Sequence, residues 1–451
     1  MIPPVPVRPR ASVAETLAVY LRPRVLIVLF LGFSAGLPLA LSGSTLQVWM
    51  TQSGVDIKTI GLFAAVGTPY TIKFLWAPIV DALDVPVLAR LLGRRRGWLL
   101  LSQFLLVVAI VLLGFCDPSA APWLVALAAL LVATASATQD IVIDAFRVES
   151  LPESEQAAGM ASYVAAYRIG MLVSTAGALF LVTRFEVMGF GENAAWTAGY
   201  IAMAGFVVIG MVTTLIATEP AKSDLAQADH AAHARENVVA RVARTAFTAF
   251  TEFLSRDAAI AVLVFVVLFK FTDALAGAMT APFVIKIGFS RDEYAAVVKG
   301  VGLAATLLGG FAGGFVARAY PLSTSLWIGG VLQALANLAF SWQATVGADI
   351  AALTFAITAE NFTSAIGTVI FVAYLSALCN NPLHTATQYA LLTALAAVGR
   401  TYLSLGAGYI AEATGWAWFF AICAAAGLPS LVLLAWLQRR GHFAKLDARS
   451  P

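Results

Sequence analysis

The sequence predicts an all-α membrane protein with about twelve transmembrane helices arranged as two six-helix bundles. Composition is the first observation behind this prediction. Of the 451 residues, 60% are hydrophobic and 12% are charged, whereas soluble domains hold roughly 45–50% apolar and about 25% charged residues. The second observation is that apolar segments of about 20 residues, the length that spans a bilayer, follow one another along the chain. A net charge of +3 does not indicate a nucleic-acid partner.

The predicted helices fall into two equal sets around a polar centre. Those of the first half lie near 25–48, 59–82, 97–115, 121–144, 156–182 and 196–217. Those of the second half lie near 257–287, 291–318, 323–342, 348–378, 384–411 and 414–438. Several are longer than about 25 residues, which predicts tilted or broken helices.

The predicted domain organisation follows from these sets. It has an N-terminal tail (1–24), a first bundle (25–217), a central loop (218–256), a second bundle (257–438) and a C-terminal tail (439–451). The end of the central loop reads VVARVARTAFTAFTEFL, which predicts an amphipathic helix on the membrane surface. The stretches SGVDIKTIGLFAAVG and IGFSRDEYAAVVKGV echo each other faintly, as in the parallel repeats of some transporters.

The placement of basic residues predicts the orientation. Most of the 28 lysines and arginines lie in segments on one side of the predicted membrane, from Arg8 and Arg10 to Arg439 and Arg440. Because cytoplasmic loops carry an excess of Lys and Arg, both termini should be cytoplasmic. The three cysteines and four histidines are scattered, so the sequence predicts no disulfide framework, no metal site and no cofactor.

Charged side chains inside the predicted helices are the candidates for function. They are Lys73, Asp140, Arg168, Lys270, Asp273, Lys299, Glu360 and Arg400. Each would cost about 2.5–3.5 kcal/mol if it faced lipid at the centre of a helix. Most should therefore face one another or a water-filled cavity, and a cavity rich in positive charge suits an anionic or polyhydroxylated solute. Gln139, Asn361 and Gln388 lie at similar depths and could bind sugar hydroxyls, or only bridge helices.

For several of these residues a purely structural role is the alternative to a functional one. Lys270 and Asp273 are three residues apart and could simply neutralise each other. Asp144 lies one turn before Arg147, where an interfacial structural role is the alternative to a gate. Asp81 ends the second helix before the basic run GRRRGW and could pair with a cytoplasmic basic group to close the inner side. The positive-inside rule alone also explains that basic run.

Two other classes of protein compete with a transporter. Asp140 and Asp144 at i, i+4 are spaced like the paired carboxylates that hold Mg²⁺ and a diphosphate in intramembrane prenyltransferases. The second half carries no second Asp-rich motif, and phosphate loops and hydrolase motifs are absent from the sequence. A transport-inactive membrane sensor would carry the same charges, and uptake by reconstituted vesicles would distinguish it.

Several longer segments carry a family resemblance. They include GFSAGLPLALSGSTLQVWM, KTIGLFAAVGTPYTIKFLWAPIVD, SATQDIVIDAF, YRIGMLVSTAGAL, FKFTDALA, AENFTSAIGT and LCNNPLHTATQYALLTALAAVGR. Together they resemble the AmpG-type muropeptide permeases of the major facilitator superfamily. The resemblance implies proton symport of anhydro-muropeptides (N-acetylglucosamine linked to 1,6-anhydro-N-acetylmuramic acid, with or without stem peptide) across the bacterial inner membrane. It also implies roles in peptidoglycan recycling and beta-lactam resistance. Related permeases carry other cargo, including acetyl-CoA.

The roles expected for individual residues follow from these arguments together. The expected substrate ligands are Lys73, Gln139, Arg168, Lys270, Asn361, Gln388 and Arg400. One of Asp140, Asp273 and Glu360 is expected to carry the proton, and Asp81, Asp144 and Arg147 are expected to form a gate. The expected partners are the muropeptide, protons and membrane lipid, and the protein is expected to be a monomer.

Overall fold

The computed structural model describes residues 18–55, 59, 63–221, 236–289, 291–379, 381, 383–401 and 406–447, and these residues form helices and connecting turns without strands. Parts of three predicted segments lie outside the described residues: the N-terminal tail (1–17, with Arg8 and Arg10), the central loop (222–235) and the C-terminal tail (448–451).

The described helices fall into the two halves of the chain. The first half contains η1 (Val19–Leu21), α2 (Pro23–Leu41), α3 (Ser44–Gln52), η2 (Phe63–Gly67), α5 (Thr68–Ile72), η3 (Lys73–Leu75), α6 (Ala77–Ala82), α7 (Leu88–Leu92), α8 (Arg94–Gly114), α9 (Pro122–Ser150), α10 (Glu153–Leu172), η4 (Val173–Gly177), α11 (Ala178–Val187) and α12 (Glu192–Ile216). The second half contains α14 (Val238–Leu254), α15 (Ala259–Ile287), α16 (Arg291–Tyr294), η5 (Ala295–Val301), α17 (Gly302–Ala319), α18 (Leu322–Val346), α19 (Ile350–Leu378), α20 (Thr385–Thr401), α21 (Ala407–Thr414), α22 (Trp416–Ala425), α23 (Leu428–Arg439) and α24 (His442–Asp447).

Ten helical stretches of the described chain are long and apolar enough to cross a membrane. The other two predicted spans do not form single long helices among the described residues. The span predicted at 59–82 contains η2, α5, η3 and α6, and the span predicted at 384–411 contains α20 and α21, with residues 402–405 between them outside the described residues. The prediction of broken helices is confirmed for the first span as well, because α2 ends at Leu41 and α3 restarts at Ser44.

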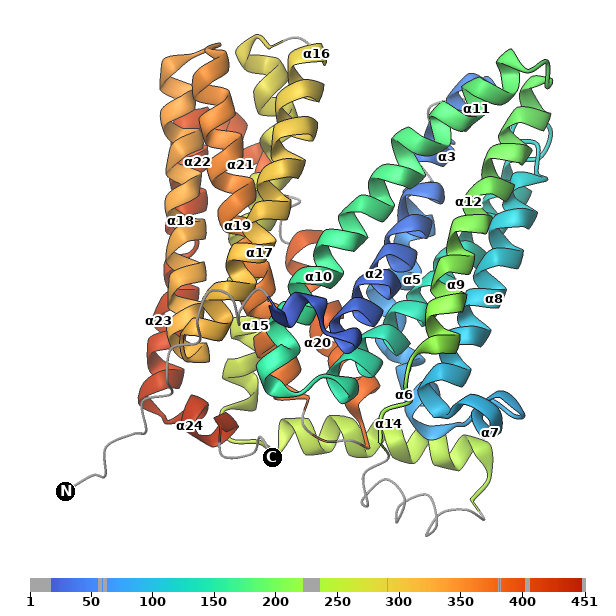
Figure 1. Cartoon of the computed structure of the whole chain (residues 1–451). Helices are drawn as coiled ribbons and strands as arrows, with labels where there is room; N and C mark the ends of the chain where they lie inside the picture. The colour runs from blue at the N-terminus through green and yellow to red at the C-terminus, as the bar shows by residue number, and fades with distance from the viewer. Residues whose placement is uncertain are drawn as a thin grey trace.

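The long helices form two groups that lie side by side (Figure 1). The first group contains α2 to α12 and the second contains α15 to α23. The groups come together around α10 and α20, toward the end of the molecule where α14 lies, which we call the α14 side, and they diverge toward α11 and α16, which we call the α16 side (Figure 1). The closest helix pair between the groups is α10 with α17.

Glycines hold the central helix pairs of each group in close contact. A Cβ on Gly36 of α2 would overlap the carbonyl oxygen of Tyr167 on α10, and one on Gly170 would overlap the carbonyl oxygen of Phe33. In the second group, a Cβ on Gly309 of α17 would overlap the carbonyl oxygen of Phe362 on α19. Small residues at such crossings let helix backbones approach closely, which is how helices associate in lipid.

Substitution of Gly36 by valine should therefore destabilise the first group. Overpacking a tight contact costs about 1–3 kcal/mol, so the purified variant should unfold in detergent at a temperature several degrees below the original protein. Gly205→Ala is the control, because a Cβ at Gly205 meets no atom within 4 Å. Equal melting temperatures for both variants would contradict the close packing of α2 on α10.

Helix α14 is the amphipathic helix that the central loop predicted. It lies across the base of the molecule, at a steep angle to the long helices (Figure 1). Its buried side chains are Thr245, Ala249 and Phe253, whereas Val239 and Phe247 are exposed. Because α14 contacts α6 of the first group and α20 of the second, it connects the two groups on the α14 side.

Candidate functional site

The first group contains a cluster of buried charges on α9 and η3. The Nζ atom of Lys73 lies 3.7 Å from a carboxylate oxygen of Asp144, and both side chains are buried. Asp140 lies one turn away on the same face of α9 and is also buried. The cation that pairs with Asp144, Lys73, therefore belongs to the same bundle.

Helix α9 also carries buried polar atoms without hydrogen-bond partners among the described residues. They are the Oδ1 atom of Asp140, in the cluster, and both amide atoms of Gln139, which precedes Asp140 in the chain. Buried polar groups in native proteins nearly always have a partner, either protein or water. This part of α9 is therefore suited to bind a polar ligand or a proton.

The second group contains a matching cluster around Asp273. A carboxylate oxygen of Asp273 lies 2.6 Å from Lys270 Nζ and accepts hydrogen bonds from Gln333 Nε2 at 2.8 Å and Ser364 Oγ at 2.9 Å. Lys270 also donates to the hydroxyl of Thr368. Lys270 and Asp273 thus pair with each other, and Glu360 lies one turn before Ser364 on α19.

The remaining expected substrate ligands lie outside these two ion pairs. Arg168 is exposed on α10 and lies within electrostatic range of Glu360 on α19 of the second group. Asn361 accepts a hydrogen bond from Thr306 Oγ1 at 3.1 Å and so bridges α19 to α17. The side chain of Arg400 lies outside the described residues. The structure brings together Lys73, Asp140 and Asp144 in one cluster and Lys270 and Asp273 in another. Glu360 lies within electrostatic range of the second cluster.

Gln388 lies on the α14 side rather than beside either cluster. Its amide donates to Glu252 on α14, and its carbonyl oxygen accepts from Arg256 at 3.2 Å. Arg256 also donates to the carbonyl of Leu378. Burial would raise the pKa of Glu252, but its hydrogen bond to Arg256, the charge of Arg256 and the bond from Gln388 together hold that pKa below its usual value. These contacts fasten α14 to the second group.

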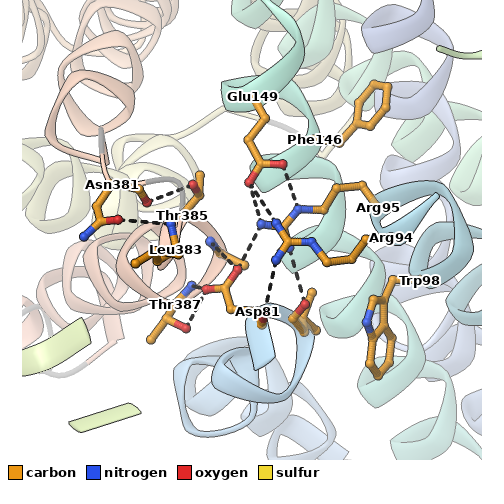
Figure 2. A network of polar contacts seen from close by, with 12 residues as sticks. Asp81, Arg94, Arg95, Trp98, Phe146, Glu149, Asn381, Leu383, Thr385 and Thr387 are labelled. Carbon is orange, nitrogen blue, oxygen red and sulfur yellow. Dashed lines mark hydrogen bonds and ion pairs between the residues drawn. The ribbon is translucent and has the colours of Figure 1, made fainter. Parts of the chain in front are cut away.

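Asp81 forms the first of three links between the two groups on the α14 side (Figure 2). Its carboxylate accepts from the backbone amides of Ala386 at 3.3 Å and Thr387 at 2.8 Å, and from Thr387 Oγ1 at 2.8 Å. These groups lie at the N-terminal end of α20, where the helix dipole favours a negative charge. A carboxylate of the first group thus caps a helix of the second.

Arg95 holds Asp81 in place. It donates to Asp81 at 2.9 Å and to both carboxylate oxygens of Glu149 at 2.5 and 2.9 Å. Figure 2 shows Arg95 between the two carboxylates. Asp81 was expected to pair with a basic group to close one side. The basic group is Arg95 of its own bundle, and the bond between bundles goes to backbone amides instead.

Arg147 forms the second link. This fully buried side chain donates to Ser376 Oγ at 3.0 Å on α19 and to Tyr389 OH at 2.9 Å on α20. Its guanidinium carbon lies 5.2 Å from the centre of the Tyr389 ring, within cation–π range. It also donates to Gln156 of its own bundle at 3.1 Å.

Tyr20 and its neighbours form the third link, where α10 meets α17. The Tyr20 hydroxyl donates to the carbonyl of Phe311 at 3.4 Å, and the two rings pack edge to face at 5.3 Å. Burial raises the pKa of Tyr20 to about 12 despite the nearby charge of Arg318, so the hydroxyl stays protonated and can donate. Arg318 donates to the carbonyl of Ser154 at 3.2 Å.

Sequence reasoning missed most partners in these links, including Tyr20, Arg95, Ser376, Thr387 and Tyr389. Arg95 stood in a basic run that orientation alone explained. Ser376 and Tyr389 are hydroxyl side chains inside apolar segments, and only the position of Arg147 opposite them reveals their role.

Two helical bundles that bury charged side chains and are joined across one face define a membrane transport protein. The family comparison agrees, because residues 28–400 match the model described as Major Facilitator Superfamily. The chain belongs to the major facilitator superfamily and, within it, to the AmpG-type permeases.

Relatives support this family by sequence similarity, and solved structures support the fold. The anhydromuropeptide permease of Escherichia coli is 39% identical over 423 residues, covering 93% of this chain and 81% of the relative. The AmpG 4 transporter of Rickettsia felis is 33% identical, covering 92% of this chain and 97% of the relative.

Among solved structures, the E. coli fucose:proton symporter matches with a TM-score of 0.67 and 13% identity, covering 91% of this chain and 98% of that chain. The proton:xylose symporter XylE matches with a TM-score of 0.64 and 11% identity, covering 94% and 96%. Identities this low show the fold alone. The predicted fold class and family are confirmed, and both relatives and fold are those of transporters rather than enzymes.

Proposed function

We propose that this protein imports anhydro-muropeptides across the bacterial inner membrane by proton symport, acting as a monomer. The observation that carries this proposal is the 39% identity to the anhydromuropeptide permease of Escherichia coli over 93% of the chain. The cargo is the disaccharide of N-acetylglucosamine and 1,6-anhydro-N-acetylmuramic acid, with or without its stem peptide.

The charges of the two clusters suit this cargo. A stem peptide carries carboxylates, and Lys73 and Lys270 place one cation in each bundle near polar side chains. Gln139, whose amide atoms have no hydrogen-bond partner among the described residues, suits the hydroxyl and acetamido groups of a sugar. In this proposal Arg168, Asn361 and Arg400 complete the substrate site, and one of Asp140, Asp273 and Glu360 carries the proton.

The α14 side is the cytoplasmic side in this proposal. Lys and Arg collect on cytoplasmic segments of membrane proteins, and α7, α14 and the end of α23 carry several of them, including Arg90, Arg244 and Arg439. Since the three links close the α14 side, this arrangement is the one that receives cargo from the periplasm. Transport then requires the links to break and the α16 side to close, as the two bundles rock about the site.

Uptake by reconstituted vesicles tests the proposal. Labelled anhydro-muropeptide should accumulate only when an imposed proton gradient is directed inward, and a protonophore should abolish accumulation. Acetyl-CoA, the competing cargo, should not accumulate under the same conditions. Accumulation of acetyl-CoA instead, or muropeptide uptake that ignores the gradient, would overturn the cargo or the coupling respectively.

A further inference from the structure

Helix α9 carries a ladder of charges that connects the buried cluster to the closed α14 side. Asp140, Asp144 and Arg147 lie at i, i+4 and i+7, so they occupy one face of the helix. At one end Asp140 has a carboxylate oxygen without a partner among the described residues. At the other end Arg147 binds Ser376 and Tyr389 of the second bundle. Asp144 stands between the two ends.

Two cations, Lys73 and Arg147, lie within reach of Asp144. Asp144 is paired with Lys73, but this ion pair is long. Its separation from Lys73 is 3.7 Å, whereas well-formed bonds between ammonium and carboxylate are about 2.7–2.9 Å long. Arg147 lies three residues further along the same helix, a spacing at which side chains meet without any backbone movement. The Nε–H of Arg147 has no hydrogen-bond partner in the described part of the chain, so it is able to donate a further hydrogen bond.

We propose that Asp144 exchanges Lys73 for Arg147 when an anionic ligand binds, and that this exchange releases the second link of the α14 side. Without ligand, Lys73 satisfies Asp144, and Arg147 stays on Ser376 and Tyr389. When a ligand carboxylate takes Lys73, Asp144 loses its cation. It then draws Arg147 away from the second bundle. The inference rests on the proposed function only in requiring an anionic cargo.

The relative strengths of the bonds favour this order of events. A buried carboxylate is costly without a paired cation, so Asp144 cannot remain alone once Lys73 is occupied. On the other side, Arg147 is held by the neutral oxygens of Ser376, Tyr389 and Gln156. Bonds in which both partners are charged are stronger than bonds to neutral acceptors. Asp144 therefore acts as a positioning residue for Arg147, and it need not touch the ligand itself.

The exchange can be tested without any ligand. Lys73→Gln removes the cation that satisfies Asp144, so Arg147 should leave Tyr389 and the α14 side should open spontaneously. Distances between spin labels at Leu91 of α7 and Tyr320 after α17, both exposed, report this opening. Cys116, which is only half-buried, is replaced by serine to keep the labelling specific. We expect the open population to rise about tenfold over the original protein.

A second substitution distinguishes the exchange from simple damage. Adding Asp144→Asn to Lys73→Gln removes the carboxylate that draws Arg147, so the α14 side should close again. General destabilisation by Lys73→Gln would not be reversed by a further change. Lys270→Gln is the matched control, since it removes the half-buried lysine of the other bundle while Asp273 keeps Gln333 and Ser364. It should leave the label distances unchanged.

Transport measurements complete the test. Asp144→Asn should bind anhydro-muropeptide with nearly unchanged affinity and import it at least about tenfold more slowly, because Arg147 stays locked. Tyr389→Phe removes one hydrogen bond that holds Arg147 on the second bundle. It should therefore restore part of the lost import rate in the Asp144→Asn/Tyr389→Phe double variant. An unchanged label distance in Lys73→Gln, or a double Lys73→Gln/Asp144→Asn protein that stays open, would overturn the exchange. Neither result depends on the cargo, so the proposed function could survive the loss of this inference.

Discussion

Asp81→Ala should slow import at least tenfold, an effect that corresponds to about 1.4 kcal/mol or more. The carboxylate caps the N-terminal end of α20 and neutralises part of the charge of Arg95. Breaking a buried ion pair by removing one partner costs about 3–5 kcal/mol. The Arg95 pair lies within the first bundle, but the bonds to Ala386 and Thr387 join the two bundles. Because only these bonds between bundles depend on a closed α14 side, their loss destabilises the closed arrangement. Initial rates of uptake, together with the label distance between Leu91 and Tyr320, measure the effect.

Asp84 supplies the control for this substitution. It lies three residues beyond Asp81 and its side chain is exposed, so Asp84→Ala removes an equal charge from the same segment without touching α20. This variant should import at the original rate. If the two alanine variants behaved alike, the cap on α20 would not be the reason for the slow import.

Asp140→Asn is expected to abolish accumulation driven by the proton gradient while leaving exchange of cargo across the membrane intact. Asparagine keeps the size and polarity of the side chain but cannot take up a proton. A gradient of one pH unit is worth about 1.4 kcal/mol for each proton moved, and the variant should gain none of it. Its internal cargo concentration should then rise only to the external one.

Two assays on the same vesicles separate coupling from transport in this variant. Counterflow, in which unlabelled cargo inside drives entry of labelled cargo, needs no net proton movement and should persist. Asp117→Asn is the control, since Asp117 lies in the turn between α8 and α9 and binds Ser119 and Asn193 there. Full accumulation by Asp140→Asn would assign the proton to Asp273 or Glu360 instead.

The sequence predicted the spans well because a bilayer imposes a simple length on apolar segments. It also predicted α14 from its periodic pattern, and it singled out Lys73, Asp140 and Asp273 because charge inside a membrane helix has a large energetic cost. Hydropathy gives the depth of a side chain but not the direction in which it points. That is why Gln388, chosen by its place in an apolar segment, proved to be bonded to α14.

The links of the α14 side were harder to predict for a different reason. Each depends on a residue of one bundle meeting a residue of the other, hundreds of positions away in the chain. Arg147 meets Tyr389 and Asp81 meets Thr387 only after both bundles have formed. A hydroxyl or a backbone amide leaves no mark in composition or periodicity, whereas its charged partner does. The charged side chains of the first two links, Asp81 and Arg147, were therefore visible in the sequence, whereas their neutral partners and the whole Tyr20 link were not.

Helix α14 touches α6 of one bundle and is tied by Glu252 and Arg256 to the other. When the α14 side opens, the weaker of these attachments must give way, so α14 should move with the second bundle and separate from α6. A small molecule that held α14 against α6 would then block the transport cycle from the α14 side. Such an inhibitor would not need to compete with cargo, and high cargo concentrations would not displace it.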